Sequence, residues 1–431
     1  MVVKTATVIG ATGTMGANIA GVFAAFGNAR VYCVGRSIEK VTRTIPRIIQ
    51  SAKGKDIASN LYPADYSMVE KCVSESDIVF ESVSEDILLK KDIARQVASF
   101  LPSNAVSCTG TSGLSVNEIA LCYPEDIRGN FFGVHLFNPP YSVSLCELIP
   151  SAYSDEKIKA SLREYLEIKL HRTVVDVKDS PAFLGNRIGF QFINEALQFA
   201  EKYKDRGGLD YIDAILGSFT GRVMPPLKTI DFVGLDVHKA IVDNIYANTR
   251  DFAHRTFILP EFAQRLFSER RFGRKSGEGL YRMVAEGAGQ KRQAVLDINT
   301  GEYRDIRVYD FSFATIMKSS IAEGNYKKAF EALVKSRSQE AKICRHFLLS
   351  HIVYSLYITK EVGYTIKAAD DVMAAGFNWC PPLALYQALS EATDVRALIK
   401  EQLPELHRII NIDALLSEVT RSDYDYRAFF K

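Results

Sequence analysis

His135 and Glu147 form a candidate pair for proton transfer. Each side chain lies in a short apolar run, and Pro139 and Pro140 between the two runs exclude a continuous helix. The pattern predicts a strand, a turn and a returning strand that set the two side chains beside each other. A carboxylate in that position keeps an imidazole in one tautomer and stabilises its charged form, so His135 is a candidate general base. A core histidine and a surface glutamate are the alternative interpretation.

The beginning of the chain predicts a nucleotide-binding unit that precedes this pair. An apolar run at 5–9 leads into a glycine-rich turn and a helix, and the run at 30–34 reads as a second strand. The turn contains Gly10, Gly13, Thr14, Met15 and Gly16. A strand, glycine turn, helix and strand within about thirty residues is typical of dinucleotide-binding folds, in which backbone N–H groups reach a pyrophosphate. The spacing GxxGxxG is one residue longer than GxGxxG, so we expect a wider turn. A turn without a ligand is the alternative.

The end of the second strand bears on the choice of cofactor. An acidic residue there binds the ribose 2′-hydroxyl of NAD, but this chain has Gly35, Arg36 and Ser37. A small residue followed by an arginine and a hydroxyl suits a 2′-phosphate better. The sequence therefore predicts NAD(P) as cofactor, with a preference for NADP. A solvated arginine at a strand end is the alternative.

The composition of the whole chain excludes several function classes. The 431 residues are 47% hydrophobic and 24% charged, and a net charge of +2 gives no general attraction to nucleic acid or membrane. The seven cysteines form no CxxC pair and no cluster with metal-ligand spacing, so we expect no metal site. No apolar run reaches the ~18 residues that a membrane span requires. The N-terminus does not resemble a targeting peptide, and we expect a reducing cytoplasm.

The order of apolar patterns predicts several domains. Residues 1–180 read as an α/β Rossmann-type domain, and the rest reads as all-α apart from a charge-rich, irregular stretch at about 284–312. We expect a first helical domain at 181–283, a linker at 284–338 and a second helical domain at 339–431. At the first boundary, Asp179 is expected to cap a helix that has Pro181 in its first turn.

The two helical domains read as copies of one unit. Met224-Pro225-Pro226-Leu227 returns as Cys380-Pro381-Pro382-Leu383. Arg187 precedes Asp213 by 26 residues, and Arg345 precedes Asp371 by the same number. Recurrence at separate anchors indicates a duplicated helical unit.

Taken together, these motifs resemble the L-3-hydroxyacyl-CoA dehydrogenase family over about residues 5–282. The repeat at about 340–400 resembles the second helical domain of multifunctional fatty-acid oxidation proteins. The motifs are the glycine-rich turn, Glu85 with Lys90, Thr111-Ser112-Gly113-Leu114-Ser115, His135-Leu136-Phe137-Asn138-Pro139, Glu147, the run from Asp179 to Arg187, and the loop 273–281. The resemblance implies oxidation of a 3-hydroxyacyl-CoA to the 3-ketoacyl-CoA with a nicotinamide cofactor, in fatty-acid β-oxidation or related acyl-CoA metabolism.

The resemblance also implies roles for single residues. The catalytic histidine and its partner fall on His135 and Glu147, and the residues that polarise the substrate fall on Ser112 and Asn186. Contacts to the cofactor fall on Glu85, Lys90, Asn138 and Lys275. Chemistry supports the first set, because removal of hydride from C3 needs a base at O3, and the reverse reaction needs donors to the keto oxygen. A turn role for Ser112, a helix-surface role for Asn186 and a solvated charge for Lys275 are the alternatives.

The sequence departs from the family in three places. Gly35 stands where the family has an aspartate, which puts a preference for NAD in doubt. Gly110 stands two residues before Ser112, where the family has an asparagine, so one contact on the nicotinamide side is in doubt. The segment after the second strand is also shorter than the family's helical insertion, so contacts to the CoA adenine cannot be transferred.

The expected partners follow from this interpretation. The substrate is an acyl-CoA, and a separate enoyl-CoA hydratase is a candidate partner because no hydratase segment is visible in these residues. We expect a monomer in which the second helical copy takes the place of a partner subunit, with a homodimer as the alternative. A dehydrogenase of a 3-hydroxy acid without CoA, and a nucleotide-binding scaffold protein with little turnover, are the rival functions.

Overall fold

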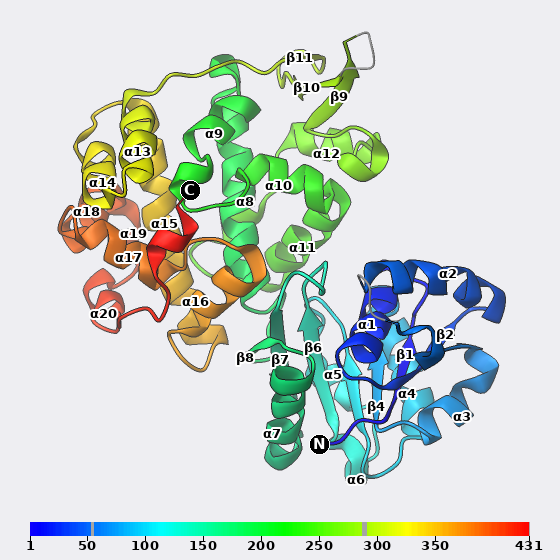
Figure 1. The fold of residues 1–431 in the computed structure, drawn as a ribbon. Helices are drawn as coiled ribbons and strands as arrows, with labels where there is room; N and C mark the ends of the chain where they lie inside the picture. The colour runs from blue at the N-terminus through cyan, green and yellow to red at the C-terminus, as the bar shows by residue number, and fades with distance from the viewer. Residues whose placement is uncertain (53–55, 287–290, 431) are drawn as a thin grey trace. The chain divides into compact units, whose positions relative to one another are not determined.

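The computed structural model describes residues 1–52, 56–286 and 291–430, and it divides into two compact units, Met1–Phe183 and Leu184–Lys431. The first unit has an α/β fold built on a mostly parallel sheet (Figure 1). The second unit is helical apart from one small sheet. This architecture confirms the predicted fold class.

The sheet of the first unit has the strand order β3-β2-β1-β4-β5-β6-β7-β8. The strands from β3 to β6 run parallel, β7 runs antiparallel to β6, and β8 is parallel to β7. This is the strand order of a dinucleotide-binding sheet with two strands added at one edge. The strand bounds are β1 Thr5–Ile9, β2 Arg30–Gly35, β3 Leu61–Asp65, β4 Ile78–Glu81, β5 Val106–Thr109, β6 Phe131–Leu136, β7 Leu145–Pro150 and β8 Thr173–Asp176.

Helices pack against this sheet in two groups. α1 packs on β1 and β2 beside α2, and α4 packs on β4 beside α3 and α5. The inner strands are apolar on both faces, as in sheets that are covered on both sides. The helix bounds are α1 Thr14–Ala25, α2 Ile38–Ser51, α3 Val69–Ser74, α4 Ile87–Ala98, α5 Val116–Ala120, α6 Glu125–Arg128 and α7 Glu156–Glu164.

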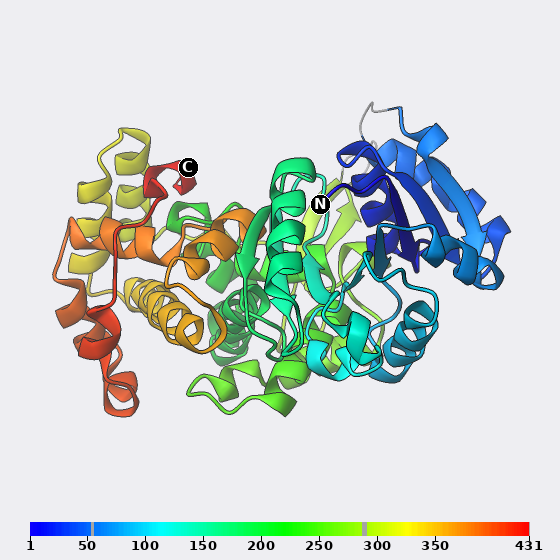
Figure 2. The same cartoon turned by 90° about the horizontal axis from the view of Figure 1, so that it is seen from below.

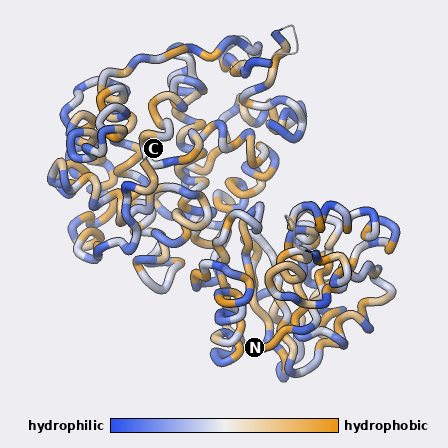
Figure 3. Tube along the Cα trace, viewed as in Figure 1, coloured by the Kyte–Doolittle hydropathy of each residue, from blue (hydrophilic) through white to orange (hydrophobic). Residues whose placement is uncertain are grey.

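The second unit is organised around two long helices, α8 and α15, which pack against each other. Figure 2 shows the same elements from a second direction. Hydrophobic and hydrophilic stretches alternate along the helices, as expected where one face of each helix is buried (Figure 3). The bounds are α8 Gly185–Lys202, α9 Leu209–Ile215, α10 Pro226–Val233, α11 Leu235–Asn248, α12 Glu261–Ser268, α13 Ser312–Ala322, α14 Tyr326–Lys335, α15 Gln339–Val362, α16 Ala368–Val372, α17 Pro382–Ser390, α18 Val395–Gln402, α19 Pro404–Ile409 and α20 Ile412–Leu416.

The stretch 284–338 is more regular than the predicted linker. A three-stranded antiparallel sheet of β9 Tyr281–Ala285, β10 Lys291–Leu296 and β11 Tyr303–Asp305 falls mostly within it, and α13 and α14 follow. α14 packs against α15 and α17, so it belongs to the helical body. The prediction of an irregular stretch is therefore wrong for the secondary structure, whereas the domain bounds stay a prediction. Residues 287–290 of that stretch, and residue 431, lie outside the described residues.

The structure explains the sequence repeat. The backbone N–H of Leu227 donates to Asp213 Oδ1 over 2.9 Å, and in the second copy Leu383 N–H donates to Asp370 Oδ1 over 2.8 Å. Each aspartate thus caps the helix that starts at a Pro-Pro-Leu sequence. The equivalent of Asp213 is therefore Asp370 and not Asp371, which corrects the predicted spacing by one residue.

The start of α8 also differs from the prediction. The helix begins at Gly185, and Asp179 caps a different helix, α5. Among the described residues, no helix has the length and apolar character needed to cross a membrane.

Candidate active site

His135 and Glu147 lie directly opposite each other on β6 and β7. His135 Nδ1 and Glu147 Oε2 are 2.7 Å apart, a hydrogen-bonding distance, and the two residues are 5% and 0% exposed. The Phe137 and Phe183 rings lie against the imidazole, with ring centres 4.5 and 5.6 Å from it. The predicted strand, turn and returning strand are confirmed, and the arrangement fixes both the orientation of the imidazole and its tautomer.

Ser112 takes its position from Glu85. The backbone N–H of Ser112 and the hydroxyl of Thr111 both donate to Glu85 Oε1, over 2.7 and 2.6 Å. Thr111 is fully buried, and its oxygen in turn accepts the N–H of Leu114. The turn that carries Ser112 is therefore anchored to the loop after β4.

A buried lysine supports Glu85. Lys90 Nζ lies 2.9 Å from Glu81 Oε1 and 3.4 Å from Glu85 Oε2, and the side chain of Lys90 is 1% exposed. Glu81 also accepts hydrogen bonds from the Thr109 hydroxyl and from Val83 N–H, over 2.7 and 2.6 Å. Lys90 was predicted to contact the cofactor, but its ammonium group is held by these two carboxylates. Sequence reasoning missed Glu81 and Thr109, whose only local signal is their place at the ends of neighbouring strands.

A second anchor comes from the end of the first unit. Asp179 accepts hydrogen bonds from the Ser115 hydroxyl and from the backbone N–H groups of Val116 and Asn117, over 2.9, 3.0 and 2.8 Å. These donors follow Ser112 closely in the chain. Asp179 therefore fixes the far side of the turn that carries Ser112.

The residues beside the His135 ring have a strained backbone. Ala182 and Phe183 have φ angles of 60° and 54°, a left-handed conformation that L residues rarely adopt, and both are fully buried. The conformation places the Phe183 ring against the imidazole.

The glycine-rich turn has the geometry of an anion cradle. Gly10 has a φ of +90°, and a Cβ atom there would lie 2.4 Å from the Ser82 carbonyl oxygen. A Cβ atom on Gly16 would lie 2.3 Å from the Gly10 carbonyl oxygen, so both positions require glycine. No side chain caps α1, whose N-cap is Gly13 and whose first residues are Thr14 and Met15. No capping side chain thus accepts hydrogen bonds from the first N–H groups of α1. These groups can donate to a pyrophosphate instead.

The end of β2 has no room for an acidic side chain. A Cβ atom on Gly35 would lie 2.7 Å from Val41 Cγ2 and 2.9 Å from Thr12 Cγ2. Arg36 is exposed next to it, and Ser37 caps α2 by accepting Lys40 N–H.

A second arginine near this position was missed from the sequence. Arg47 Nη2 donates to the carbonyl oxygens of Thr12 and Gly13 over 3.3 and 3.4 Å. Arg47 follows Arg36 by eleven positions, which is about three helical turns. This spacing is the sequence signal from which Arg47 could have been predicted to lie near the turn.

Asn138 lies close to the glycine-rich turn. Its Oδ1 atom accepts a hydrogen bond from Asn18 Nδ2 of α1 over 3.1 Å. The structure thus brings Asn138 to the helix that starts at the turn, on the same unit as His135.

The other two predicted site residues belong to the second unit. Asn186 is the second residue of α8 and is 4% exposed. Lys275 is half-exposed and forms an ion pair with Asp236 at the start of α11.

The departure at Gly110 also has a structural cause. A Cβ atom there would lie 2.7 Å from Cε1 of Phe80, so the Phe80 ring occupies the space that a larger side chain would need. Gly110 N–H donates to the Glu81 carbonyl oxygen over 2.8 Å, which keeps the strand end in place.

Comparison with known proteins identifies the family of this chain. Residues 5–180 match the family profile described as 3-hydroxyacyl-CoA dehydrogenase, NAD binding domain, and residues 183–283 match the C-terminal domain of the same family. The chain belongs to the 3-hydroxyacyl-CoA dehydrogenase family. The two matches cover the His135 pair, the glycine-rich turn and the start of α8.

This chain matches some relatives over nearly their full length and others over less than half of it. The human protein "Hydroxyacyl-coenzyme A dehydrogenase, mitochondrial" is 30% identical over 65% of this chain and 92% of its own length. A Bacillus subtilis protein named "Probable 3-hydroxyacyl-CoA dehydrogenase" is 26% identical over 82% of this chain, but the match spans only 44% of that protein. A solved Escherichia coli 3-hydroxybutyryl-CoA dehydrogenase covers 97% of this chain and 99% of its own, with a TM-score of 0.69 and 19% identity. That last likeness is one of fold, and it extends over both helical copies.

Proposed function

We propose that this family member is a 3-hydroxyacyl-CoA dehydrogenase that moves a hydride reversibly between C3 of an L-3-hydroxyacyl-CoA and NAD(P). The observation that carries the proposal is the buried His135–Glu147 pair, with Nδ1 and Oε2 2.7 Å apart. Because Glu147 engages Nδ1, the second ring nitrogen, Nε2, is the atom that takes the proton from O3 of the substrate. Glu147 then stabilises the imidazolium that this transfer forms.

The rest of the chain supports the same chemistry. Ser112, anchored by Glu85 and Asp179, and Asn186 supply a hydroxyl and an amide that donate to the substrate oxygen. When bound, the nicotinamide cofactor supplies the hydride acceptor. The turn from Gly10 to Gly16 would hold its pyrophosphate at the start of α1, with Glu85, Asn138 and Lys275 as further contacts. Lys90 acts through Glu85, because its own ammonium group is buried against carboxylates.

The proposed preference for NADP rests on the residues at the end of β2. The space beside Gly35 does not admit a carboxylate, and the nearest acidic residue on the neighbouring strand, Asp65, accepts hydrogen bonds from Ser67. Arg36 remains as a charged group that suits a 2′-phosphate. We therefore assign a preference for NADPH over NADH.

A steady-state assay tests the activity and separates the rival functions. The full chain is assayed with acetoacetyl-CoA and with free acetoacetate, each with NADPH and with NADH. We expect turnover with the CoA ester and a higher kcat/KM with NADPH. Equal use of the free acid would favour a dehydrogenase of small 3-hydroxy acids. Tight cofactor binding without turnover would favour the scaffold function.

The packing of the second copy supports a proposal for the oligomeric state. Phe347 of α15 packs edge-on against Phe192 and Phe199 of α8, with ring centres 5.0 and 4.9 Å apart. The Phe377 ring lies so close to Gly189 that a Cβ atom there would be 2.3 Å from it. Next to these rings, Cys380 N–H donates to the Gly221 carbonyl oxygen over 2.7 Å, and both residues lie just before or within the Pro-Pro-Leu segments of their copies. The second copy covers apolar surface of α8, and we propose a monomer with an internal pseudo-dimer.

Light scattering coupled to size exclusion tests this assembly. The full chain should have a mass near its sequence value of 48.1 kDa at micromolar concentration. A chain that ends after residue 285 exposes the rings of α8, and it should dimerise or aggregate. A full chain of twice the expected mass, or a soluble monomeric truncation, would show that the second copy does not have this covering role.

The cellular setting and pathway partner are part of the same proposal. All seven cysteines are free thiols, which agrees with the reducing cytoplasm expected from the sequence. A separate enoyl-CoA hydratase would supply the L-3-hydroxyacyl-CoA substrate.

A further inference from the structure

Each helical copy buries an arginine near the start of its long helix, and the first copy also buries Arg222, which is 2% exposed. Arg187 lies in the first turn of α8 and is 4% exposed, and Arg345 lies near the start of α15 and is 5% exposed. Each precedes the aspartate that caps the Pro-Pro-Leu helix of its own copy. Arg187 precedes Asp213 by 26 residues and Arg345 precedes Asp370 by 25, so the two positions are similar, and the surroundings of the two guanidinium groups can be compared.

Among the described residues, only Arg187 of the two has an ion-pair partner within 4.0 Å. Arg187 forms an ion pair with buried Asp251, and that carboxylate also accepts the hydroxyl of Tyr354 over 3.1 Å. Arg345 Nη1 instead donates to the carbonyl oxygens of Leu333 and Ser336 over 2.6 and 2.7 Å, and its Nε atom donates to Gln402 Oε1 over 3.2 Å. These acceptors are all neutral.

Arg345 thus makes no ion pair within the described part of the chain, and the carboxylate of Glu401 acts on its charge only from a greater distance. Among residues 1–52, 56–286 and 291–430, no carboxylate lies within 4.0 Å of it, and its Nη2 atom makes no hydrogen bond. Burial lowers the pKa of Arg345, which is the expected effect of desolvation on a cation. A buried charge is normally paired, so an anion bound beside Nη2 would complete the surroundings of this guanidinium.

A hollow of about 320 Å³ opens at this guanidinium. It lies between the α14–α15 junction and α18, and four cationic and two carboxylate side chains line it, for a net charge of +2. The six charged residues are Lys335, Arg337, Lys342, Arg345, Asp394 and Glu401. The hollow is large enough for a small anion together with part of the molecule that carries it.

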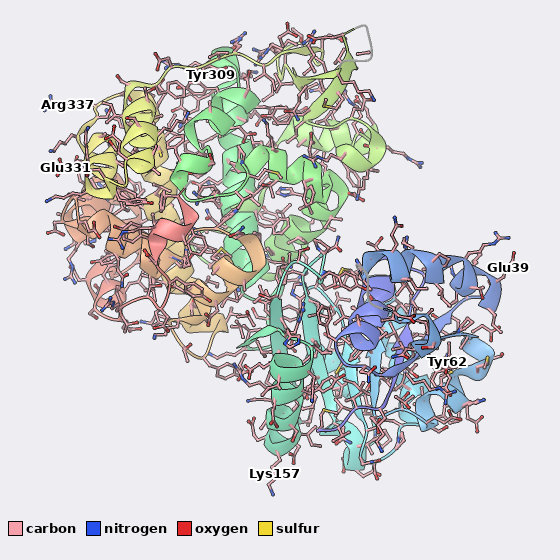
Figure 4. All side chains as sticks on the ribbon, in the orientation of Figure 1. Glu39, Tyr62, Lys157, Tyr309, Glu331 and Arg337 are labelled. Carbon is pink, nitrogen blue, oxygen red and sulfur yellow. The ribbon has the colours of Figure 1, made fainter. Side chains whose placement is uncertain are left out.

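The two carboxylates of the hollow accept hydrogen bonds within the protein, whereas two of its cations form no ion pair in the described part of the chain. Asp394 caps α18 by accepting Ala397 N–H over 3.1 Å, and Glu401 accepts Gln402 Nε2 over 3.0 Å. Arg337 and Lys342 are exposed and form no ion pair within the part of the chain that the structure describes. Arg337 lines the hollow, and its side chain extends outward from the surface near α14 (Figure 4).

The N-terminus of α15 adds to the positive potential. This helix has 24 residues, and its N-cap, Ser338, lies between Arg337 and the first helical residue. The partial positive charge of a long helix is concentrated in its first turn, and Lys342 lies in that turn of α15.

We propose that this hollow is an anion site that binds a phosphate group, either inorganic phosphate or the phosphate monoester of a small metabolite. Arg345 Nη2 forms the floor of the site, and Arg337 and Lys342 close it from the solvent side. Guanidinium groups suit phosphate because their N–H donors match its oxygens in pairs. The site lies between the end of α14 and the second copy, and none of its lining residues belongs to the proposed dehydrogenase site.

Titration calorimetry on the full chain tests the site, with inorganic phosphate, AMP and acetate as probes at constant ionic strength. Arg345 itself is too deeply buried for a safe substitution, so the variants are Lys342→Glu and Arg337→Glu. The matched control is Lys328→Glu, an exposed lysine of α14 that does not line the hollow. Charge reversal at the site should weaken phosphate binding at least about tenfold, since charge-assisted hydrogen bonds are lost and a repulsion is added. The control should stay within about twofold of the wild type, the change expected of a screened surface charge.

The probes also identify the ligand. Tighter binding of AMP than of inorganic phosphate, lost in Lys342→Glu, would indicate a phosphorylated metabolite, and the reverse order would indicate phosphate itself. Acetate should bind far more weakly than either. The absence of saturable phosphate binding in the wild type, or equal binding by Lys342→Glu and Lys328→Glu, would overturn the proposal.

Discussion

The backbone N–H of Ser112 donates to Glu85 Oε1 over 2.7 Å, so the residue assigned to polarise the substrate is positioned by a carboxylate 27 residues earlier in the chain. That carboxylate in turn lies 3.4 Å from the buried ammonium group of Lys90. The site therefore depends on a charged network that never has to touch the substrate.

Replacement of Lys90 tests this network. Lys90→Met removes the cation that Glu81 and Glu85 share and leaves buried Glu81 uncompensated, so it should lower the free energy of unfolding by about 3–5 kcal/mol. The neighbouring Lys91→Met is the control, because Lys91 pairs with exposed Glu118 and should cost less than about 1 kcal/mol. Urea denaturation measures both. Equal losses in the two variants would mean that the buried network contributes no special stability.

The proposed preference for NADPH rests on one exposed arginine. Arg36→Ala should raise KM for NADPH about tenfold or more and leave KM for NADH nearly unchanged, because only the 2′-phosphate loses its charge-assisted hydrogen bonds. Arg43→Ala is the control, since Arg43 is an exposed arginine of α2, the helix that follows Arg36, and pairs with Glu39. If the wild type itself favours NADH tenfold in kcat/KM, Arg36 is only a surface charge.

The left-handed backbone at Ala182 predicts a stabilising substitution. Ala182→Gly removes the steric cost of a Cβ atom at a φ of 60° and should raise the free energy of unfolding by about 1 kcal/mol. The same change at Ala196, inside α8, should lower it by about 1 kcal/mol because glycine is a poor helix former. Thermal unfolding compares the two variants, and a destabilised Ala182→Gly would show that the Ala182 methyl group contributes more by packing than it costs in strain.

A buried histidine makes the fold sensitive to acid. Burial lowers the pKa of His238 from its ordinary 6.5 to about 3, and His238 Nε2 lies 2.9 Å from Asn194 Oδ1. In the unfolded chain, His238 is therefore protonated below about pH 6.5. In the folded chain it stays neutral down to about pH 3. The contribution of His238 to the free energy of unfolding is complete above pH 6.5. It decreases as the pH is lowered, by up to about 1.4 kcal/mol per pH unit.

The variant His238→Gln isolates that effect. Glutamine can still donate to Asn194 but cannot be protonated. The slope of the unfolding free energy against pH, between pH 6 and 4, should therefore decrease by the equivalent of about one proton. His407→Gln, at an exposed position, should leave the slope unchanged. Unfolding free energies across this pH range decide the matter, and identical slopes for wild type and His238→Gln would refute the assignment.

The sequence predicted those features that local patterns determine. Two prolines between apolar runs were enough to predict the hairpin that pairs His135 with Glu147, and the glycine spacing predicted the turn at α1. Long-range partners could not be predicted in this way. Asp179 caps α5 from more than sixty residues away, and no local pattern distinguishes that role from capping the next helix.

The same reason explains the stretch after residue 283. Its charged residues suggested an irregular linker, but Arg304 forms hydrogen bonds with Asp210 over 2.8 Å across 94 residues and so holds β11 to the first helical copy. Charges that pair over such a distance look like solvated charges in the sequence. The repeat was visible, but its register was one residue off, because equivalence depends on which aspartate caps the helix.

The central claim is that His135 is the general base and Glu147 its orienting partner. The direct measurement is kcat of His135→Ala with acetoacetyl-CoA and the preferred reduced cofactor, together with the cofactor dissociation constant. We predict a fall in kcat by about two to four orders of magnitude, the usual contribution of acid–base catalysis, with cofactor affinity almost unchanged. A variant that retains more than about a third of the wild-type kcat would contradict the assignment.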